Sequence, residues 1–260
     1  MALTTTQGTR ARVVRSSSGL LALLAAWWCV SALGTPLLPS PAQVLTALVT
    51  ETVAGRLLPD VAVSLGRVLG GFVLGASAGV VAGALVAQSW VARAGLWPLL
   101  ELARPVPPLA WIPVAILWFG IEETSKIFVI ALGAFFPVLL NTYVGMRRLD
   151  ANWIRAARAL GAGRRQVFFG VVLPASLPDI VTGVKSGWSL AFISLIAAEL
   201  VASRSGLGAL LTVGRLNDRL DVILAGVVVI GLLGLVVDWA MRVAGRHLLV
   251  WNLDLARATE

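Results

Sequence analysis

The segment "WIRAARALGAGRR", Trp153 to Arg165, carries four arginines and lies between the apolar stretches 127–144 and 177–201. Of the 260 residues, 58% are hydrophobic and only 13% are charged, whereas a soluble domain has about 25% charged residues. Apolar runs of this length are typical of membrane-spanning helices. The predicted fold class is therefore all-α integral membrane, and the quoted segment is a loop outside the bilayer.

Composition excludes several other classes of protein. The single cysteine, Cys29, allows no disulfide framework, and the single histidine, His247, leaves no imidazole set for zinc. We therefore expect no metal site. The chain has no phosphate-binding glycine loop and no catalytic triad, so we expect neither a cofactor nor an enzyme. Arginines of cytoplasmic loops explain the net charge of +8, and no nucleic-acid partner is expected.

The hydropathy pattern predicts about six transmembrane helices, with the arginine-rich loop 145–174 between the fourth and the fifth. The positive-inside rule places this loop, and with it both termini, in the cytoplasm. An outside loop is expected at 202–221. The predicted spans cover residues 20–38, 61–87, 96–119, 127–144, 177–201 and 222–243.

The chain is accordingly divided into a cytoplasmic N-terminal tail (1–18), a first transmembrane helix with an external loop (19–56), a main transmembrane domain (57–245) and a cytoplasmic C-terminal tail (246–260). A cleaved signal peptide is the alternative for the first apolar stretch, because Val30-Ser31-Ala32 resembles a cleavage site. Residues 40–60 are expected to form an external loop with a short interfacial helix.

Two spans carry helix-specific patterns. Glycines recur every fourth residue in the second span, which places them on one face where another backbone can approach; they are Gly71, Gly75, Gly79 and Gly83. The third span contains "RPVPPLAWIP" (104–113), whose four prolines predict a broken beginning. Broken backbone is tolerated in a membrane only against protein or a cavity.

The quoted segment predicts a helix from Trp153 to Leu160, with Trp153, Ala157 and Leu160 on one face. Gly161 follows as a C-terminal cap. A second short helix is expected at 164–169 and is interrupted by prolines before the fifth span begins. From these residues alone, contact with lipid headgroups and docking on a protein are equally favoured.

A resemblance favours docking. The loop resembles the EAA loop of inner-membrane permeases of ATP-binding-cassette importers, whose pattern is Glu-Ala-Ala, three residues, Gly, nine residues, then Ile-x-Leu-Pro. Arg155 stands at the glutamate position. The segments 104–128, 132–147 and 197–211 look like the nitrate, sulfonate and taurine branch of these permeases. The matching positions of the loop are Ala156, Ala157, Gly161, Val171, Leu173 and Pro174.

The resemblance implies a type I importer permease fold in a prokaryotic plasma (inner) membrane. It implies two copies of an ATPase subunit that use ATP and Mg, an extracytoplasmic substrate-binding protein, and a homodimer around the translocation path. The solute is expected to be a small anion such as a sulfonate, taurine or nitrate. The implied ATPase-docking coupling helix comprises Trp153, Arg155, Ala156, Ala157, Leu160 and Gly161.

Charged and proline residues inside the spans are candidates for the gate or the pore. For Arg104 and also for Arg67, anchoring at the membrane interface is the alternative. For Glu199 the alternative is a pair with Arg204, and for Lys185 it is contact with lipid headgroups. The candidates are Arg104, Pro108, Pro113, Lys185 and Glu199.

Two other functions are compatible with the residues alone. A secondary transporter or channel would use the intramembrane charges for ion coupling and would need no ATPase. A membrane scaffold would have no transport role.

Overall fold

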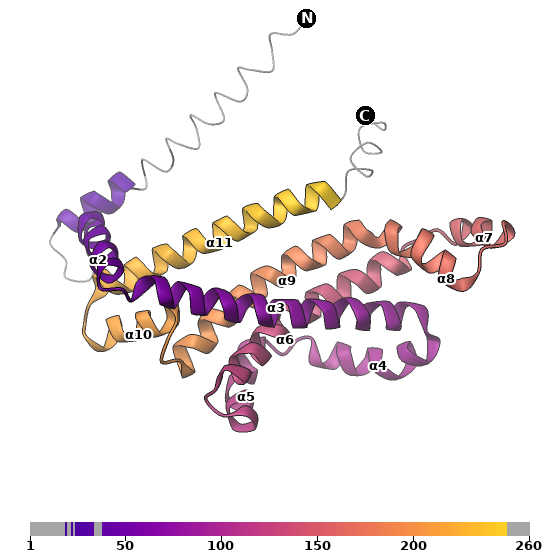
Figure 1. Cartoon of the computed structure of the whole chain (residues 1–260), viewed down its shortest axis with the longest axis horizontal. Coiled ribbons are helices and arrows are strands. Elements are labelled where there is room, and N and C mark those ends of the chain that lie inside the picture. The colour runs from indigo at the N-terminus through magenta and orange to yellow at the C-terminus, as the bar shows by residue number, and fades with distance from the viewer. Residues whose placement is uncertain (1–18, 20–21, 23, 34–37, 249–260) are drawn as a thin grey trace, which may run out of the picture. The chain divides into compact units, whose positions relative to one another are not determined.

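The computed structural model describes residues 19, 22, 24–33 and 38–248, with side chains as far as 245 (Figure 1). The predicted N-terminal tail and residues 249–260 of the predicted C-terminal tail lie outside the described residues. Every regular element in the described part is helical, which confirms the all-α class. The chain divides into two compact units: residues 1–59 with 210–229, and residues 60–209 with 230–260.

The first unit contains a helical stretch at 24–32, α2 (Pro41–Val53) and the beginning of α11. Ser40 starts α2 with a capping box, in which its hydroxyl accepts the Gln43 N–H and the Gln43 side chain accepts the Ser40 N–H. This helix is the one predicted in the external loop. The carboxylate of buried Glu51 pairs with Arg56 at 2.9 Å and with Arg219 at 3.8 Å.

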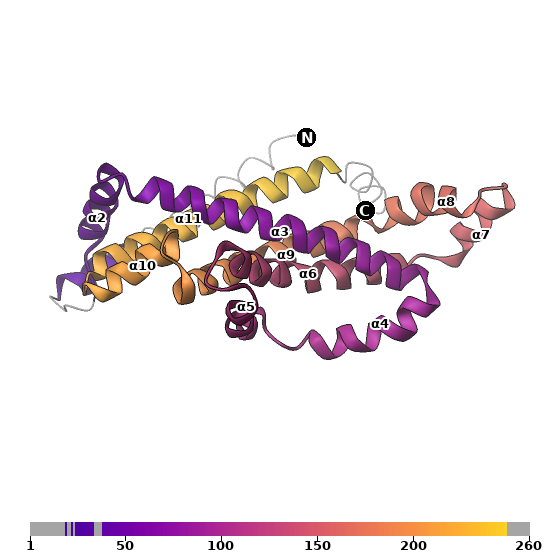
Figure 2. The ribbon, with the colours of Figure 1, turned by 60° about the horizontal axis from the view of Figure 1, so that its bottom comes forward.

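The second unit is built around α3 (Leu57–Gln88), α6 (Glu123–Arg147) and α9 (Leu173–Ala202), which run alongside one another in Figures 1 and 2. The glycine stripe of α3 faces α6. A Cβ at Gly75 would overlap the Ala131 carbonyl oxygen, and one at Gly79 would lie 2.8 Å from that of Phe135. The two backbones approach closely because these positions have no side chains, so the stripe packs within the chain.

The predicted third span is two helices joined at a sharp bend. α4 (Trp90–Ala103) and the segment formed by η1 (Pro108–Trp111) and α5 (Ile112–Phe119) meet at 91°. A break was predicted from the prolines, but at the beginning of the span. It lies at residues 104–107 instead, because α4 starts earlier, capped by Ser89, and continues through Pro98.

The loop before the fifth span is more helical than predicted. α7 (Ala151–Ala159) is followed by α8 (Arg164–Val167), the π-helix η2 (Phe168–Val172) and α9, which form one continuous segment from Arg164 to Ala202. The predicted interruption at Pro174 and Pro178 is wrong. A wide π-turn precedes Pro174, and the Phe168 carbonyl accepts the N–H of Leu173, so the helix accommodates the proline ring.

Two further helices complete the described chain. α10 (Leu207–Leu216) occupies part of the predicted outside loop, and α11 (Leu220–Leu248) is the predicted last span. Four helices of the described part are long and apolar enough to cross a membrane, and the bent pair makes a fifth. The first predicted span lies partly outside the described residues, so six spans remain a prediction.

Candidate functional site

The arginine-rich helix α7 has a defined beginning and end. The Asp150 carboxylate accepts the Asn152 N–H at 2.9 Å and caps the first turn. Gly161 follows the last turn with a φ of +86°, and the N–H of Ala162 donates to the Ala157 carbonyl at 3.1 Å. This bond belongs to a Schellman motif, so the predicted cap at Gly161 is confirmed and α7 is a short helix with both ends capped.

The faces of α7 differ from the prediction at one position. Ile154 and Ala157 pack against a buried apolar cluster of the same chain, formed by Met146, Val167, Val172 and Ile180. Ala157 therefore does not share an outward face with Trp153 and Leu160, which are 57% and 89% exposed. The i, i+3 pair of Ile154 and Ala157 anchors the helix, and Ile154 was not among the predicted residues.

The remaining surface of α7 is exposed and basic. Arg155 donates to the Asn152 side chain at 2.6 Å and makes no ion pair within the described residues. The backbone N–H of Asn152, and then its side-chain amide, hold the pKa of Asp150 below its ordinary value. Ala156 is also exposed. Figure 1 shows α7 with α8 at one end of the α6–α9 pair.

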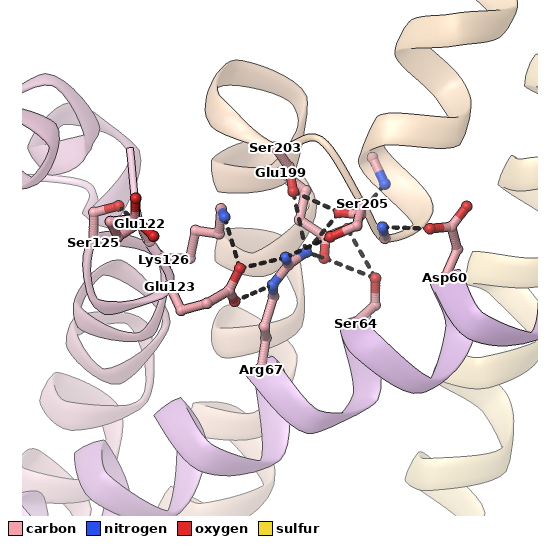
Figure 3. Close-up of polar contacts among 12 residues, drawn as sticks. Asp60, Ser64, Arg67, Glu122, Glu123, Ser125, Lys126, Glu199, Ser203 and Ser205 are labelled. Carbon is pink, nitrogen blue, oxygen red and sulfur yellow. Dashed lines mark hydrogen bonds and ion pairs between the residues drawn. The ribbon is translucent and has the colours of Figure 1, made fainter. Parts of the chain in front are cut away.

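A buried polar network lies at the end of the second compact unit that is opposite to α7. Arg67 of α3 is the centre of this network (Figure 3). The guanidinium is 4% exposed and binds the Glu123 carboxylate through Nε at 2.5 Å and Nη2 at 2.6 Å. Nη1 donates to Glu199 at 2.7 Å and to the Ser205 carbonyl at 2.7 Å. The arginine therefore joins α3 to α6 and to the turn between α9 and α10.

Glu199 of α9 is fully buried and is satisfied on both oxygens. It accepts hydrogen bonds from the Ser64 hydroxyl at 2.8 and 2.9 Å, from Arg67, and from the Gly208 N–H at 2.9 Å. The Ser64 oxygen in turn accepts the Leu207 N–H at 2.9 Å. Three side chains and two backbone amides thus fix the start of α10 against α3.

The charges of the network balance. Lys126, which is 4% exposed, pairs with Glu123 at 3.0 Å, so two cations face the two carboxylates. The alternative partner considered for Glu199, Arg204, is wrong: Arg204 is exposed and Arg67 takes that place. Interface anchoring of Arg67 is also wrong because its side chain is buried. Buried charges of this kind are tolerated only when paired.

Two of the gate or pore candidates line one cavity. Arg104 and Pro108, from the bend between α4 and η1, face Pro137 of α6 and Leu190 of α9 across a volume of about 220 Å³. Arg104 lies beside the middle of α6 and not beside either of its ends. This position favours the pore over anchoring at the membrane interface, and both stay predictions.

The other three candidates are separate from this cavity, and Glu199 belongs to the Arg67 network. Pro113 occupies the first turn of α5, where its missing N–H is no loss. Lys185 is half-buried on α9, and its terminal atoms would lie 3.3 Å from a Cβ added at Gly245 of α11. The structure therefore does not bring all five candidates together.

Comparison with known proteins gives a consistent result. Residues 75–250 match the family described as "binding-protein-dependent transport system inner membrane component". The chain is 41% identical over 226 residues to a probable ABC transporter permease of Brucella abortus (strain 2308), covering 87% of this chain and 90% of that one. It is 39% identical over 252 residues to the taurine transport system permease protein TauC of Escherichia coli (strain K12), covering 93% and 91%.

A more distant relative and a solved structure extend the likeness. The nitrate import permease protein NrtB of Synechocystis is 30% identical over 240 residues, covering 87% of this chain and 86% of that one. The fold is similar to that of a chain in inward-facing MetNI methionine ABC transporter structures, with a TM-score of 0.59, 20% identity, and coverage of 71% of this chain and 92% of that chain.

Proposed function

Because the chain belongs to the family of binding-protein-dependent transport system inner membrane components, we propose that it forms the path for a small anion in an ATP-binding-cassette importer. It is a permease subunit, and its homologues are permeases of such importers. The proposed assembly is a homodimer with two ATPase subunits, in which ATP and Mg are used by the partner. A secondary transporter or channel without an ATPase is disfavoured by these homologues.

The exposed surface of α7 is the observation that carries the proposed ATPase contact. α7 is capped at its first turn and ends in a Schellman turn. An ATPase subunit that binds this helix would therefore displace it as a whole. Trp153 and Leu160 leave apolar area uncovered, while Ile154 and Ala157 tie the helix to the spans. A movement of α7 would therefore be transmitted to α6 and α9 through this cluster.

The solute and the topology are part of the same proposal. TauC and NrtB are described as permeases for taurine and nitrate, both of which carry an oxyanion group. We extend that class of solute to this chain, with delivery by an external binding protein. The basic loop with α7 would face the cytoplasm together with both termini, and the Arg67 network would then lie near the outer surface.

Co-purification tests the ATPase contact. The protein carries a C-terminal tag, is extracted in mild detergent from its own organism, and co-purifying subunits are identified. The test variant is Gly161→Asp, because an added Cβ meets nothing within 4 Å and aspartate adopts a positive φ more often than most residues. Gly55→Asp is the matched control, with a φ of +72° and equally open surroundings outside α7.

We expect the ATPase to accompany the parent and the Gly55→Asp variant and to be lost from Gly161→Asp. An ATPase retained by all three proteins would remove α7 as the docking site. If no ATPase is captured from the parent even after cross-linking, the importer assignment fails.

A further inference from the structure

Arg104 is a charged residue at the bend of a broken span. It ends α4, and the three prolines at 105, 107 and 108 follow within four residues. We propose that Arg104 binds the negative group of the solute at a site in the middle of the membrane. The inference rests on the proposed function, because it names a residue that selects the transported anion.

The depth of this site follows from the helices that line it. The cavity residues of α6 run from Leu132 to Leu140, the middle of a 25-residue helix. At 1.5 Å per residue, this stretch begins about 14 Å from the Glu123 end of the helix and ends about 10 Å from the Arg147 end. The hydrocarbon core of a bilayer is about 30 Å thick, so Arg104 lies near its centre.

A cation at that depth needs either a partner or water. The Arg104 side chain makes no hydrogen bond or ion pair within the described part of the chain, and it is exposed. Arg67, by contrast, is buried with two carboxylates. Unpaired intramembrane charges face water-filled cavities and mark substrate pathways. Five N–H donors of a guanidinium are therefore available to an oxyanion.

The walls of the cavity define the rest of the ligand. They are almost entirely apolar, with Pro108 on the side of the arginine and with Phe136 and Leu190 contributed by α6 and α9. One polar group is added by the backbone: Pro137 has no N–H, so the Gly133 carbonyl loses its regular helical donor. A cation beside apolar walls fits a small anion with a short apolar body, and the Gly133 carbonyl can accept a hydrogen bond where that body carries an amino group.

The size of the cavity limits the class further. A volume of about 220 Å³ is below the roughly 300–1,000 Å³ typical of sites for drug-sized ligands. It is large enough for an ion such as nitrate or a short alkyl sulfonate. The chain turns through 91° at residues 104–107. Arg104 lies at this bend, where it lines the cavity together with residues of α6.

Charge-selective labelling of a cysteine in the cavity tests this site without any ATPase. The background is Cys29→Ser, which removes the exposed natural cysteine, and the reporter is Leu140→Cys. The full-length protein in nanodiscs is treated with a methanethiosulfonate that bears either an ethylsulfonate or an ethyltrimethylammonium group. Each rate is divided by the rate of the same reagent with a free thiol in solution.

We expect the sulfonate reagent to be favoured, and Arg104→Gln to lower its normalised preference roughly tenfold. Arg104→Lys should retain most of the preference, and Arg204→Gln, which removes an exposed arginine elsewhere, should leave it unchanged. Ethanesulfonate should slow the labelling of the parent and not of Arg104→Gln. Leu74→Cys, on an exposed face at mid-length of α3, is the reporter expected to react with neither reagent.

A preference that is unchanged in Arg104→Gln, or a Leu140→Cys reporter that reacts with neither reagent, would overturn the proposal. The two proposals fail separately. Capture of the ATPase without an anion preference removes only the Arg104 site. An Arg104-dependent preference without any ATPase removes the importer assembly and leaves an anion site in a different kind of transporter.

Discussion

At the scale of single residues, Arg67 and Glu199 connect parts of the chain that are 132 positions apart. Each carries a charge that the membrane would otherwise exclude, and each is almost inaccessible to solvent. Removal of one partner of such a pair leaves a buried charge without compensation. The pair therefore holds the α9–α10 turn on α3. If either residue is removed, the charge of the other destabilises the folded protein.

We predict that Glu199→Ala destabilises the protein by about 3–5 kcal/mol because Arg67 loses a buried partner. Thermal unfolding followed by tryptophan fluorescence in detergent measures the change. Glu101→Ala is the matched control, since Glu101 is exposed on α4, and it should unfold like the parent. Equal unfolding temperatures for Glu199→Ala and Glu101→Ala would show that the network contributes nothing.

Gly206→Ala tests the same turn from the backbone side. Gly206 has a φ of +99°, and an added Cβ would overlap the Glu199 carboxylate and lie 2.7 Å from the Arg67 guanidinium. We expect a loss of about 1–3 kcal/mol in stability from the backbone strain alone. Gly95→Ala in α4 meets nothing within 4 Å and should be neutral or stabilising. The same thermal assay ranks the two variants, and the reverse order would contradict the geometry.

The sequence indicated that Glu199 and Arg67 were unusual, but it could not pair them. Charge and predicted depth are properties of one residue, whereas the pair depends on how α3 and α9 pack. The nearby Arg204 was the alternative because it is close in sequence. Ser64 and Glu123, which complete the network, gave no signal at all because serine and a helix-terminal glutamate are common at such positions.

At the scale of elements, helix existence was predictable and helix boundaries were not. Hydropathy identifies α3, α6, α9 and α11 because each is a long apolar run. Proline was the misleading signal. It breaks the chain at 104–107 but is accommodated at Pro137 within α6 and after the π-turn at Pro174. Composition alone does not distinguish a proline in a bend from one preceded by a widened turn.

Asp150→Ala is the test for the element α7. Loss of the cap frees the Asn152 N–H, so the first turn should fray and its amides should exchange faster in hydrogen–deuterium exchange. Asp150→Asn should preserve protection, because asparagine caps equally well. The pKa of Asp150 is lowered in the folded protein, so the stabilisation by its charge is present at neutral pH and lost as the pH falls through that lowered value. Unchanged exchange in Asp150→Ala would show that the anchors Ile154 and Ala157 alone order α7.

At the scale of the whole molecule, the second unit is held together where α3 meets α6 without intervening side chains. Small residues replace the hydrophobic driving force that is missing between helices in lipid. The four-residue glycine period indicated that face from the sequence, whereas its partner helix could not be inferred. A face of small residues can pack closely against any of several helices. The structure shows that α6 is the helix that packs against the glycines of α3.

Gly75→Ala should therefore affect the whole unit. The added methyl group would overlap the Ala131 backbone, and a backbone carbonyl cannot move aside as a flexible side chain can. We expect separation of α3 from α6 and a loss of roughly 1–3 kcal/mol, the usual cost of overpacking. Gly66→Ala and Gly70→Ala, in the same helix with nothing within 4 Å, make the same chemical change without the clash. If the stripe is a packing face, Gly75→Ala unfolds at a lower temperature than both controls. If all three variants unfold together, α3 and α6 are not in contact in the membrane and the glycine period serves another surface.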